Sequence, residues 1–165
     1  GIGTELIKMY EHPYIYLDHQ LIREKGLDLG EVERAMLAHP RVHVVSVVND
    51  EEQLVGVLDL AALADDLFFH IMPEEFLSEI TDLEQAMHYA EMSGMRTAAD
   101  AMHEAVWVKQ GETVKDAFKR MHEHGLPGLP VVDDRYHVVG YINLLELMAV
   151  CLGFEDLMDR AEEDA

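Results

Sequence analysis

The feature that most constrains this sequence is an internal repeat at a fixed offset of 84 residues. Residues 44–60 (VVSVVNDEEQLVGVLDL) align without gaps on residues 128–144 (GLPVVDDRYHVVGYINL). Glycine recurs at the same place in both copies, as Gly56 and Gly140. A match of this extent predicts two copies of one small structural unit rather than two unrelated halves.

Both copies predict the same order of secondary structure. Short apolar runs on either side of a polar turn predict paired strands at 44–48, 54–58, 129–132 and 138–142. A further strand is expected upstream in each copy, at 14–17 and at 106–108. The fold class is therefore predicted to be α/β (α+β), with each copy folding as strand, helix, strand, strand and helix.

Capping signals place the first helix of each copy. Thr113 is followed three residues later by Asp116, which is the spacing of a capping box. The apolar stripe of this helix is predicted to consist of Val114, Ala117, Phe118 and Met121. Asp28 and Glu31 have the same spacing in the first copy. Both positions predict the first residue of a helix.

The stretch between the copies has no counterpart in the repeat. Its apolar residues recur at spacings of four and three, which predicts an amphipathic helical insertion; they are Phe76, Ile80, Leu83 and Met87. The expected organisation is a first motif at 4–69, an inserted helical segment at 70–96, a second motif at 97–153 and an acidic helix or tail at 154–165.

The net charge of the chain limits the classes of partner that it can bind. With 33 acidic and 12 basic residues the formal net charge is -21, which disfavours a phosphate backbone or an anionic membrane surface. No apolar run approaches the roughly 20 residues that span a bilayer. The one cysteine, Cys151, cannot form an intramolecular disulfide. We therefore expect a cytoplasmic protein without nucleic-acid partners or direct membrane insertion.

Residues 97–148 closely resemble the CBS motif, named after cystathionine β-synthase. The resemblance rests on the strand sequence LPVVD at 129–133, on Gly140 at the next strand, and on the entry helix that ends at Met102. The first copy is a weaker match, because it has an extra stretch at 21–26 and Ser46 in place of the usual proline. The resemblance implies that two motifs pack about a pseudo-twofold axis to form a cleft, and that two such pairs form a disc-like homodimer.

The resemblance also implies which residues bind. In the family, a G-x-x-[ST]-x-x-D signature places a hydroxyl near a phosphate and a carboxylate near a ribose. The second copy has Asn143 and Glu146 at these positions, whereas the first has Asp59 and Ala62. Asp59 would repel a phosphate and Ala62 cannot hold a ribose, so a nucleotide is expected to prefer the half with Glu146. The alternative is that Asn143 and Glu146 only cap a helix.

Four further residues match the apolar adenine slot of the family: Ala105, Val106, Leu129 and Pro130. The alternative is that they are ordinary strand core. Trp107 lies beside them, and strand alternation leaves the direction of its side chain open.

Neither metal nor catalytic motifs are evident in the sequence. His122 and His124 are two residues apart and cannot share a helix face, so no transition-metal site is predicted. Carboxylate runs such as those at 50–52 and 133–134 are suited either to Mg²⁺ or to solvated turns. No nucleophile–base pair or phosphate loop occurs, so we do not expect an enzyme.

The sequence thus predicts a regulatory CBS pair, also called a Bateman module, that requires no cofactor. It would sense an adenosine nucleotide (AMP, ADP or ATP) and pass a conformational signal to a fused domain or to a regulated enzyme or transporter. The alternatives are a Mg²⁺ sensor and, less favoured, a small enzyme. Homodimerisation is expected through apolar helix faces that include Leu144, Leu145, Leu147, Met148, Leu63 and Leu67.

Overall fold

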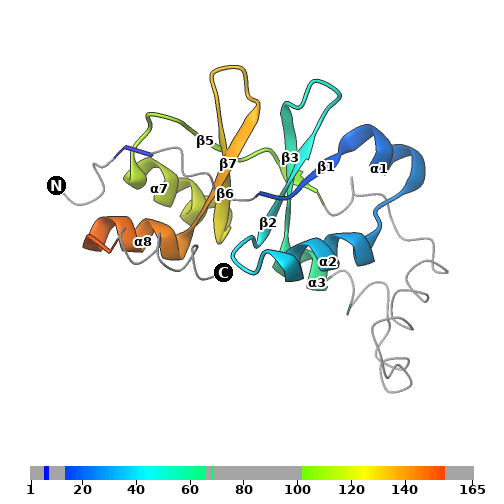
Figure 1. The fold of residues 1–165 in the computed structure, drawn as a ribbon, viewed down its shortest axis with the longest axis horizontal. Helices are drawn as coiled ribbons and strands as arrows, with labels where there is room; N and C mark the ends of the chain where they lie inside the picture. The colour runs from blue at the N-terminus through cyan, green and yellow to red at the C-terminus, as the bar shows by residue number, and fades with distance from the viewer. Residues whose placement is uncertain (1–5, 8–13, 66–67, 69–101, 155–165) are drawn as a thin grey trace.

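The computed structural model describes residues 6–7, 14–65, 68 and 102–154. The inserted segment predicted at 70–96 and the stretch predicted at 154–165, apart from Phe154, lie outside these residues. Two small sheets stand side by side, each with its own helices (Figure 1). No helix among the described residues is long and apolar enough to cross a membrane.

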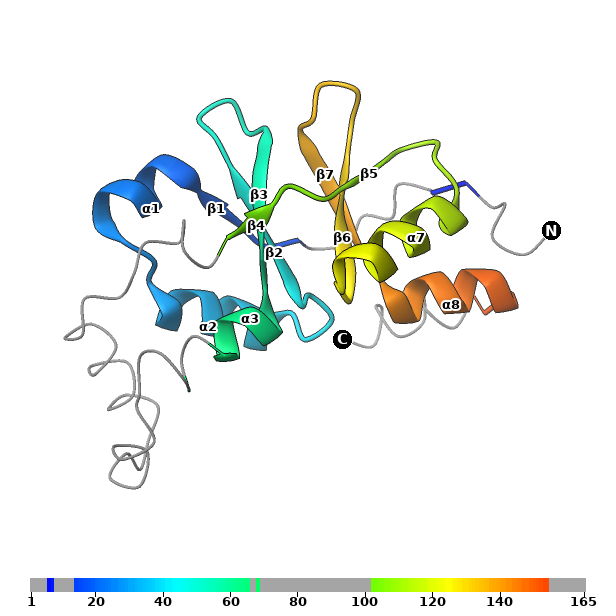
Figure 2. The same ribbon diagram turned by 180° about the vertical axis from the view of Figure 1, so that it is seen from behind.

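The first motif comprises a four-stranded sheet and three helices. Its elements are β1 (Tyr16–Asp18), α1 (His19–Lys25), α2 (Leu29–Ala38), β2 (Val44–Val48), β3 (Leu54–Asp59) and α3 (Leu60–Asp65). The fourth strand, β4 (His103–Glu104), comes from beyond the inserted segment and pairs antiparallel with β3. The strands β4 and β3 lie next to each other in Figure 2. A Cβ atom at Gly56 would overlap the side chain of Met102, so glycine permits this close approach.

The second motif has a three-stranded sheet in the order β5-β6-β7. Its elements are β5 (Val108–Lys109), α7 (Val114–His124), β6 (Gly128–Val132), β7 (Val138–Asn143) and α8 (Leu144–Leu152). In both motifs the first strand is parallel to the second and the second is antiparallel to the third. The predicted fold class is confirmed, with β4 added to the first sheet.

The capping predictions are confirmed at both helices. The Asp28 carboxylate accepts a hydrogen bond from the Glu31 N–H at 3.1 Å, and α2 begins at the next residue. Thr113 and Asp116 form a reciprocal capping box at the start of α7. Local side-chain chemistry therefore decides where these helices begin.

The upstream strands are shorter and later than predicted. The strand predicted at 106–108 is Val108–Lys109, because the hydrogen-bonded pairing with β6 begins only at Val108. The strand predicted at 14–17 is Tyr16–Asp18. Leu17 pairs with Val47 as Val108 pairs with Val131, which makes Leu17 and Val108 equivalent. Their offset exceeds 84 by seven residues, which is the length of α1.

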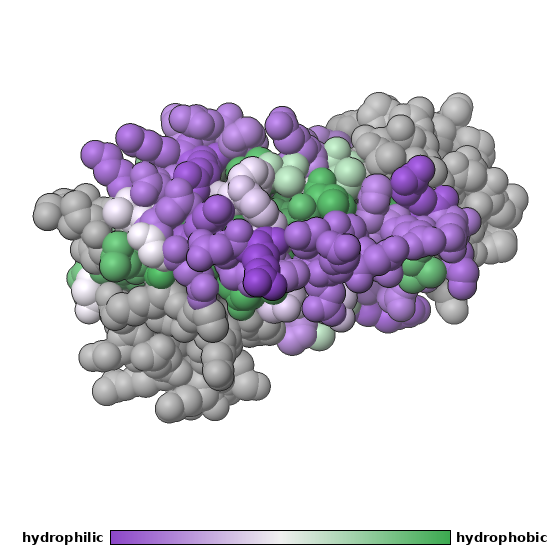
Figure 3. Space-filling view, turned by 90° about the horizontal axis from the view of Figure 1, so that it is seen from above, coloured by the Kyte–Doolittle hydropathy of each residue, from purple (hydrophilic) through white to green (hydrophobic). Residues whose placement is uncertain are grey.

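The two motifs share one hydrophobic core. Every residue of β2 and β6 is buried, and these central strands lie against each other. At the hairpin turns, the Leu54 N–H donates to the Tyr136 carbonyl at 2.9 Å and the Gln53 side chain donates to the Arg135 carbonyl at 3.0 Å. The face of the molecule seen from above is mainly hydrophilic, with a hydrophobic area near its middle (Figure 3).

Candidate ligand-binding site

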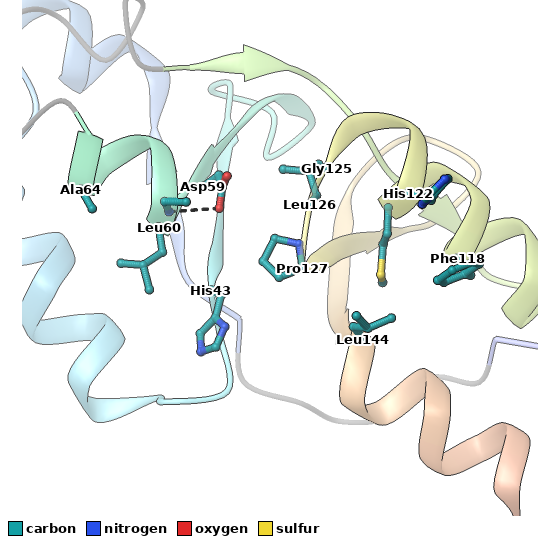
Figure 4. A pocket seen from close by; sticks show the side chains of 12 residues that line it. His43, Asp59, Leu60, Ala64, Phe118, His122, Gly125, Leu126, Pro127 and Leu144 are labelled. Atoms are coloured by element: carbon teal, nitrogen blue, oxygen red, sulfur yellow. Dashed lines mark hydrogen bonds between the residues drawn. The ribbon is translucent and has the colours of Figure 1, made fainter.

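A cavity of about 580 Å³ lies at the boundary between the two motifs (Figure 4). One side is formed by the end of β3 and by α3 of the first motif, and the other by α7 and the turn that leads into β6. The volume falls within the range of small-molecule sites. Because both motifs supply its walls, a ligand here would touch both copies of the repeat.

Asp59 is the acidic group of this cavity. It is the last residue of β3, where the ladder pairs it with Val44, and it is only 8% exposed. Its Oδ1 atom accepts a long hydrogen bond of 3.3 Å from the Ala61 N–H. Within the described part of the chain, no hydrogen bond reaches the other carboxylate oxygen, which leaves it available to a ligand.

The opposite wall is apolar and aromatic. The rings of Phe118 and His122 stack at a centroid distance of 6.0 Å with an interplanar angle of 21°. Met121 and Leu144 also line the cavity, and Figure 4 shows Leu144 on the same side as Phe118. The sequence predicted Phe118 as part of the apolar stripe of its helix, but it is 47% exposed and borders the cavity instead.

His43 lies at the lower edge of the cavity. Its ring Nε2 is 2.8 Å from the Pro40 carbonyl, and because a carbonyl only accepts, this nitrogen carries the hydrogen. The His43 carbonyl in turn accepts from the Leu60 N–H at 3.0 Å, which holds the start of α3 against β2. Sequence reasoning missed His43, although it occupies the repeat position of Pro127, which also lines the cavity.

The residue equivalent to Asp59 in the second motif, Asn143, is engaged on both sides of its amide. Its Oδ1 accepts from the Glu146 N–H at 2.8 Å, and its Nδ2 donates to the Arg41 carbonyl at 3.2 Å. It therefore caps α8 and ties that helix to the first motif. Glu146 is buried at 4% exposure. Neither residue lines the cavity, and the ribose role of Glu146 stays a prediction.

Tyr141 links the signatures of the two motifs. Its hydroxyl accepts from the His43 N–H at 3.2 Å, so β7 is joined to the residue just before β2. Burial raises the pKa of Tyr141 to about 12, and the nearby carboxylates of Glu146 and Asp59 add to this rise. Tyr141 thus connects the two motifs through a buried, neutral hydroxyl at their boundary.

The four residues that match the adenine slot of the family are placed in the strands and the connection before them. Val106, Leu129 and Pro130 are buried, and Ala105 is half-buried. Val106 and Leu129 belong to the shared core, in line with the alternative reading as strand core. None of the four borders the described cavity, so their contact with an adenine stays a prediction.

Nowhere in the described part of the chain do three or more His, Cys, Asp or Glu side chains gather as metal ligands. The acidic runs at 50–52 and 133–134 lie in the two hairpin turns. The Mg²⁺ alternative therefore stays a prediction.

The last helix has an apolar outer surface. Leu144, Leu145 and Met148 are 38%, 73% and 53% exposed. The expectation was wrong for Leu63 and Leu147, which are buried because they face the core of their own motif, while Leu67 lies outside the described residues. The homodimer stays a prediction, now with a smaller set of surface residues.

Comparisons with known proteins agree with this fold. The sequence profile of the CBS domain matches residues 98–153. No curated protein matches the chain in sequence. A CBS domain-containing protein from Thermotoga maritima has a similar structure, with 21% identity, coverage of 86% of this chain and 87% of that one, and a TM-score of 0.60.

Two further solved structures contain ligands. The CBS domain pair of the protein MJ0100, in complex with 5′-methylthioadenosine and S-adenosyl-L-methionine, is 18% identical, with coverage of 90% and 92% and a TM-score of 0.56. The protein CBSX2 in complex with AMP is 16% identical, with coverage of 88% and 90% and a TM-score of 0.55. Residues 98–153 thus match the CBS domain, and the chain as a whole has the fold of CBS-domain pairs.

Proposed function

We propose that this chain is a regulatory module that binds an adenosine-containing small molecule in the cavity between its motifs and catalyses no reaction. The observation that supports this best is the cavity itself, because it combines an apolar aromatic wall with one buried acidic group. Pockets of this composition are typical of small-molecule sites. Two similar structures contain adenosine ligands, namely 5′-methylthioadenosine with S-adenosyl-L-methionine and AMP.

The proposed signal is a change in how the two motifs are held together. A ligand in the cavity would contact α3 of the first motif and α7 of the second at once. It would favour whichever arrangement of the motifs gives it the better contacts, and a partner or fused domain could read that shift. The hydrogen bond from the His43 N–H to the Tyr141 hydroxyl lies directly at this boundary.

A cavity-filling substitution tests the proposal. Ala61 is exposed on α3 and lines the cavity, so Ala61→Trp should occupy the space with little damage to the core. Adenosine titrated into the wild type should give a binding isotherm, and a ligand at 100 times its dissociation constant should stabilise the fold by about 2.7 kcal/mol. Ala61→Trp should abolish both effects.

Ala38→Trp is the matched control, because Ala38 is an exposed alanine at the end of α2 and does not line the cavity. It should bind adenosine like the wild type. If adenosine, AMP and ATP all leave the melting temperature unchanged, the proposal fails. Stabilisation by Mg²⁺ alone would then favour the cation sensor.

A further inference from the structure

We propose that the cavity selects an adenosine ligand with a positively charged substituent, such as an ammonium or sulfonium group, over a phosphorylated one. The inference rests on the proposed function and deepens it, because it assigns the charge of the ligand. Its centre is Asp59, the one carboxylate among the described residues that line the cavity. The ligand charge then follows from what surrounds this group.

The Asp59 carboxylate has few compensating groups around it among the described residues. The Asp59 side chain is buried, with only 8% of the residue exposed. Its one hydrogen bond within the described residues is the long bond of 3.3 Å from the Ala61 N–H. No lysine or arginine lines the described cavity. A buried carboxylate is costly unless a cation or several donors compensate it, so a cationic ligand would supply what the protein does not.

The second step concerns the phosphate of a nucleotide. A phosphate monoester carries a charge of about -1.5 to -2 at neutral pH, and repulsion between like charges strengthens where water is excluded. The short helix α3 begins directly after Asp59 and brings no basic side chain to the cavity.

The third step concerns the remainder of the ligand. The stacked rings of Phe118 and His122, together with Met121 and Leu144, give the cavity aromatic and apolar groups for a purine base to contact. Asp59 belongs to the other motif, across the cavity in Figure 4. The cavity therefore has an apolar end and an acidic end, which matches a molecule with an aromatic base and a cationic substituent.

The test uses three ligands that differ only at the 5′ position: 5′-amino-5′-deoxyadenosine, 5′-methylthioadenosine and AMP. They carry a positive, a zero and a negative substituent on the same nucleoside. Calorimetric titration of the wild type at pH 7.5 should give affinities in that order. The amine should bind about tenfold or more tightly than the thioether, because a charge-assisted hydrogen bond is stronger than a neutral one.

Asp59→Asn keeps the shape of the side chain and an oxygen for the Ala61 N–H. It should weaken binding of the amine about tenfold, to the level of the thioether, and leave the thioether unchanged. Asp134→Asn is the matched control: it removes the same charge from an exposed turn away from the cavity and should change none of the three affinities. Melting curves of both variants establish that they fold.

The outcomes separate this inference from the proposed function. If AMP binds more tightly than the amine, or if the preference for the amine survives in Asp59→Asn, the inference is overturned while ligand binding stands. If none of the three ligands binds, the proposed function fails. Should Asp59→Asn not fold, the order of the wild-type affinities still decides the matter: AMP that binds as tightly as the amine would contradict the inference.

Discussion

The two motifs have the same pairing of their three repeated strands, yet they use one equivalent position in opposite ways. Asp59 and Asn143 are equivalent under the repeat and both end a strand. The amide of Asn143 makes two hydrogen bonds, one of them to the first motif, whereas the carboxylate of Asp59 makes one long bond and borders a cavity. One copy has thus become a structural tie and the other a candidate binding group.

A second pair of positions shows how the motifs differ in packing. The second motif has the small residue Gly128 and the large residue Tyr141, and the repeat places Val44 and Val57 at the same positions in the first motif. A Cβ atom at Gly128 would overlap the Tyr141 ring and hydroxyl. The large side chain fits only because its neighbour has none, and its hydroxyl can then reach the first motif.

The largest loss of folding stability is expected from a substitution that disrupts the fit between Gly128 and Tyr141. Gly128→Val should destabilise the fold by about 3 kcal/mol, because the new side chain must displace the buried Tyr141. The backbone at Gly128 has no positive φ, so strain in the main chain does not contribute. Chemical denaturation followed by far-UV circular dichroism would measure the loss.

The double variant Gly128→Val/Tyr141→Val copies the pair found in the first motif and serves as the control. It should recover at least half of the lost stability, although the hydrogen bond from the His43 N–H is gone, which costs about 1 kcal/mol. Purely additive losses would show that the two positions are not coupled and that the motifs do not differ in the proposed way.

This comparison also shows what could be predicted from the sequence. The hairpins, the two helix starts at Thr113 and Asp28 and the fold class follow from local patterns and from the repeat. The strand β4 has only two residues, and no pattern of that length predicts a partner. The bond from Asn143 to the Arg41 carbonyl and the cavity beside Asp59 depend on how two distant segments meet, which no local spacing encodes.

A smaller loss of folding stability is expected from changing a pair of residues that is ionic in the second motif and apolar in the first. Counted from the helix caps, Glu112 and Arg120 correspond to Leu27 and Ala35. The Arg120 guanidinium makes two hydrogen bonds to the Glu112 carboxylate, at 2.6 and 2.5 Å, and holds the pKa of Glu112 below its usual range. Glu112→Gln should cost about 1–2 kcal/mol at pH 7 in urea denaturation.

The sign of the pH dependence follows from that lowered pKa. The stabilising contribution of the Glu112 carboxylate is present above its unfolded pKa of about 4.3 and is lost as the pH falls through its lower folded pKa. The difference between wild type and Glu112→Gln should therefore shrink from pH 7 towards pH 3. A difference that persists undiminished in acid would mean that the ion pair is not its cause.

The double variant Glu112→Leu/Arg120→Ala, which copies the first motif, should be more stable than Glu112→Leu alone.

The smallest change in folding stability is expected at two equivalent residues that both have a left-handed backbone conformation. These two residues also show the clearest contrast between the motifs. Glu52 has a φ of 62° and its repeat equivalent Tyr136 a φ of 67°, both in the hairpin turns. Such a conformation costs roughly 1–2 kcal/mol for a residue with a Cβ atom, and glycine relieves this at an entropic cost of about 0.5–1 kcal/mol. Glu52→Gly should therefore raise stability by up to about 1 kcal/mol.

Tyr136→Gly should not give this gain, because the ring of Tyr136 has partners in the folded state. It meets Trp107 edge-to-face at a centroid distance of 5.4 Å, and the Lys109 ammonium lies 4.6 Å from its centre. These contacts contribute roughly 1–2 kcal/mol together, which offsets the relief of strain. Thermal melts of the two variants should consequently shift in opposite directions, or Tyr136→Gly should stay level while Glu52→Gly rises. Equal upward shifts would mean that the aromatic contacts do not stabilise the second turn and that the two hairpins are held by their backbones alone.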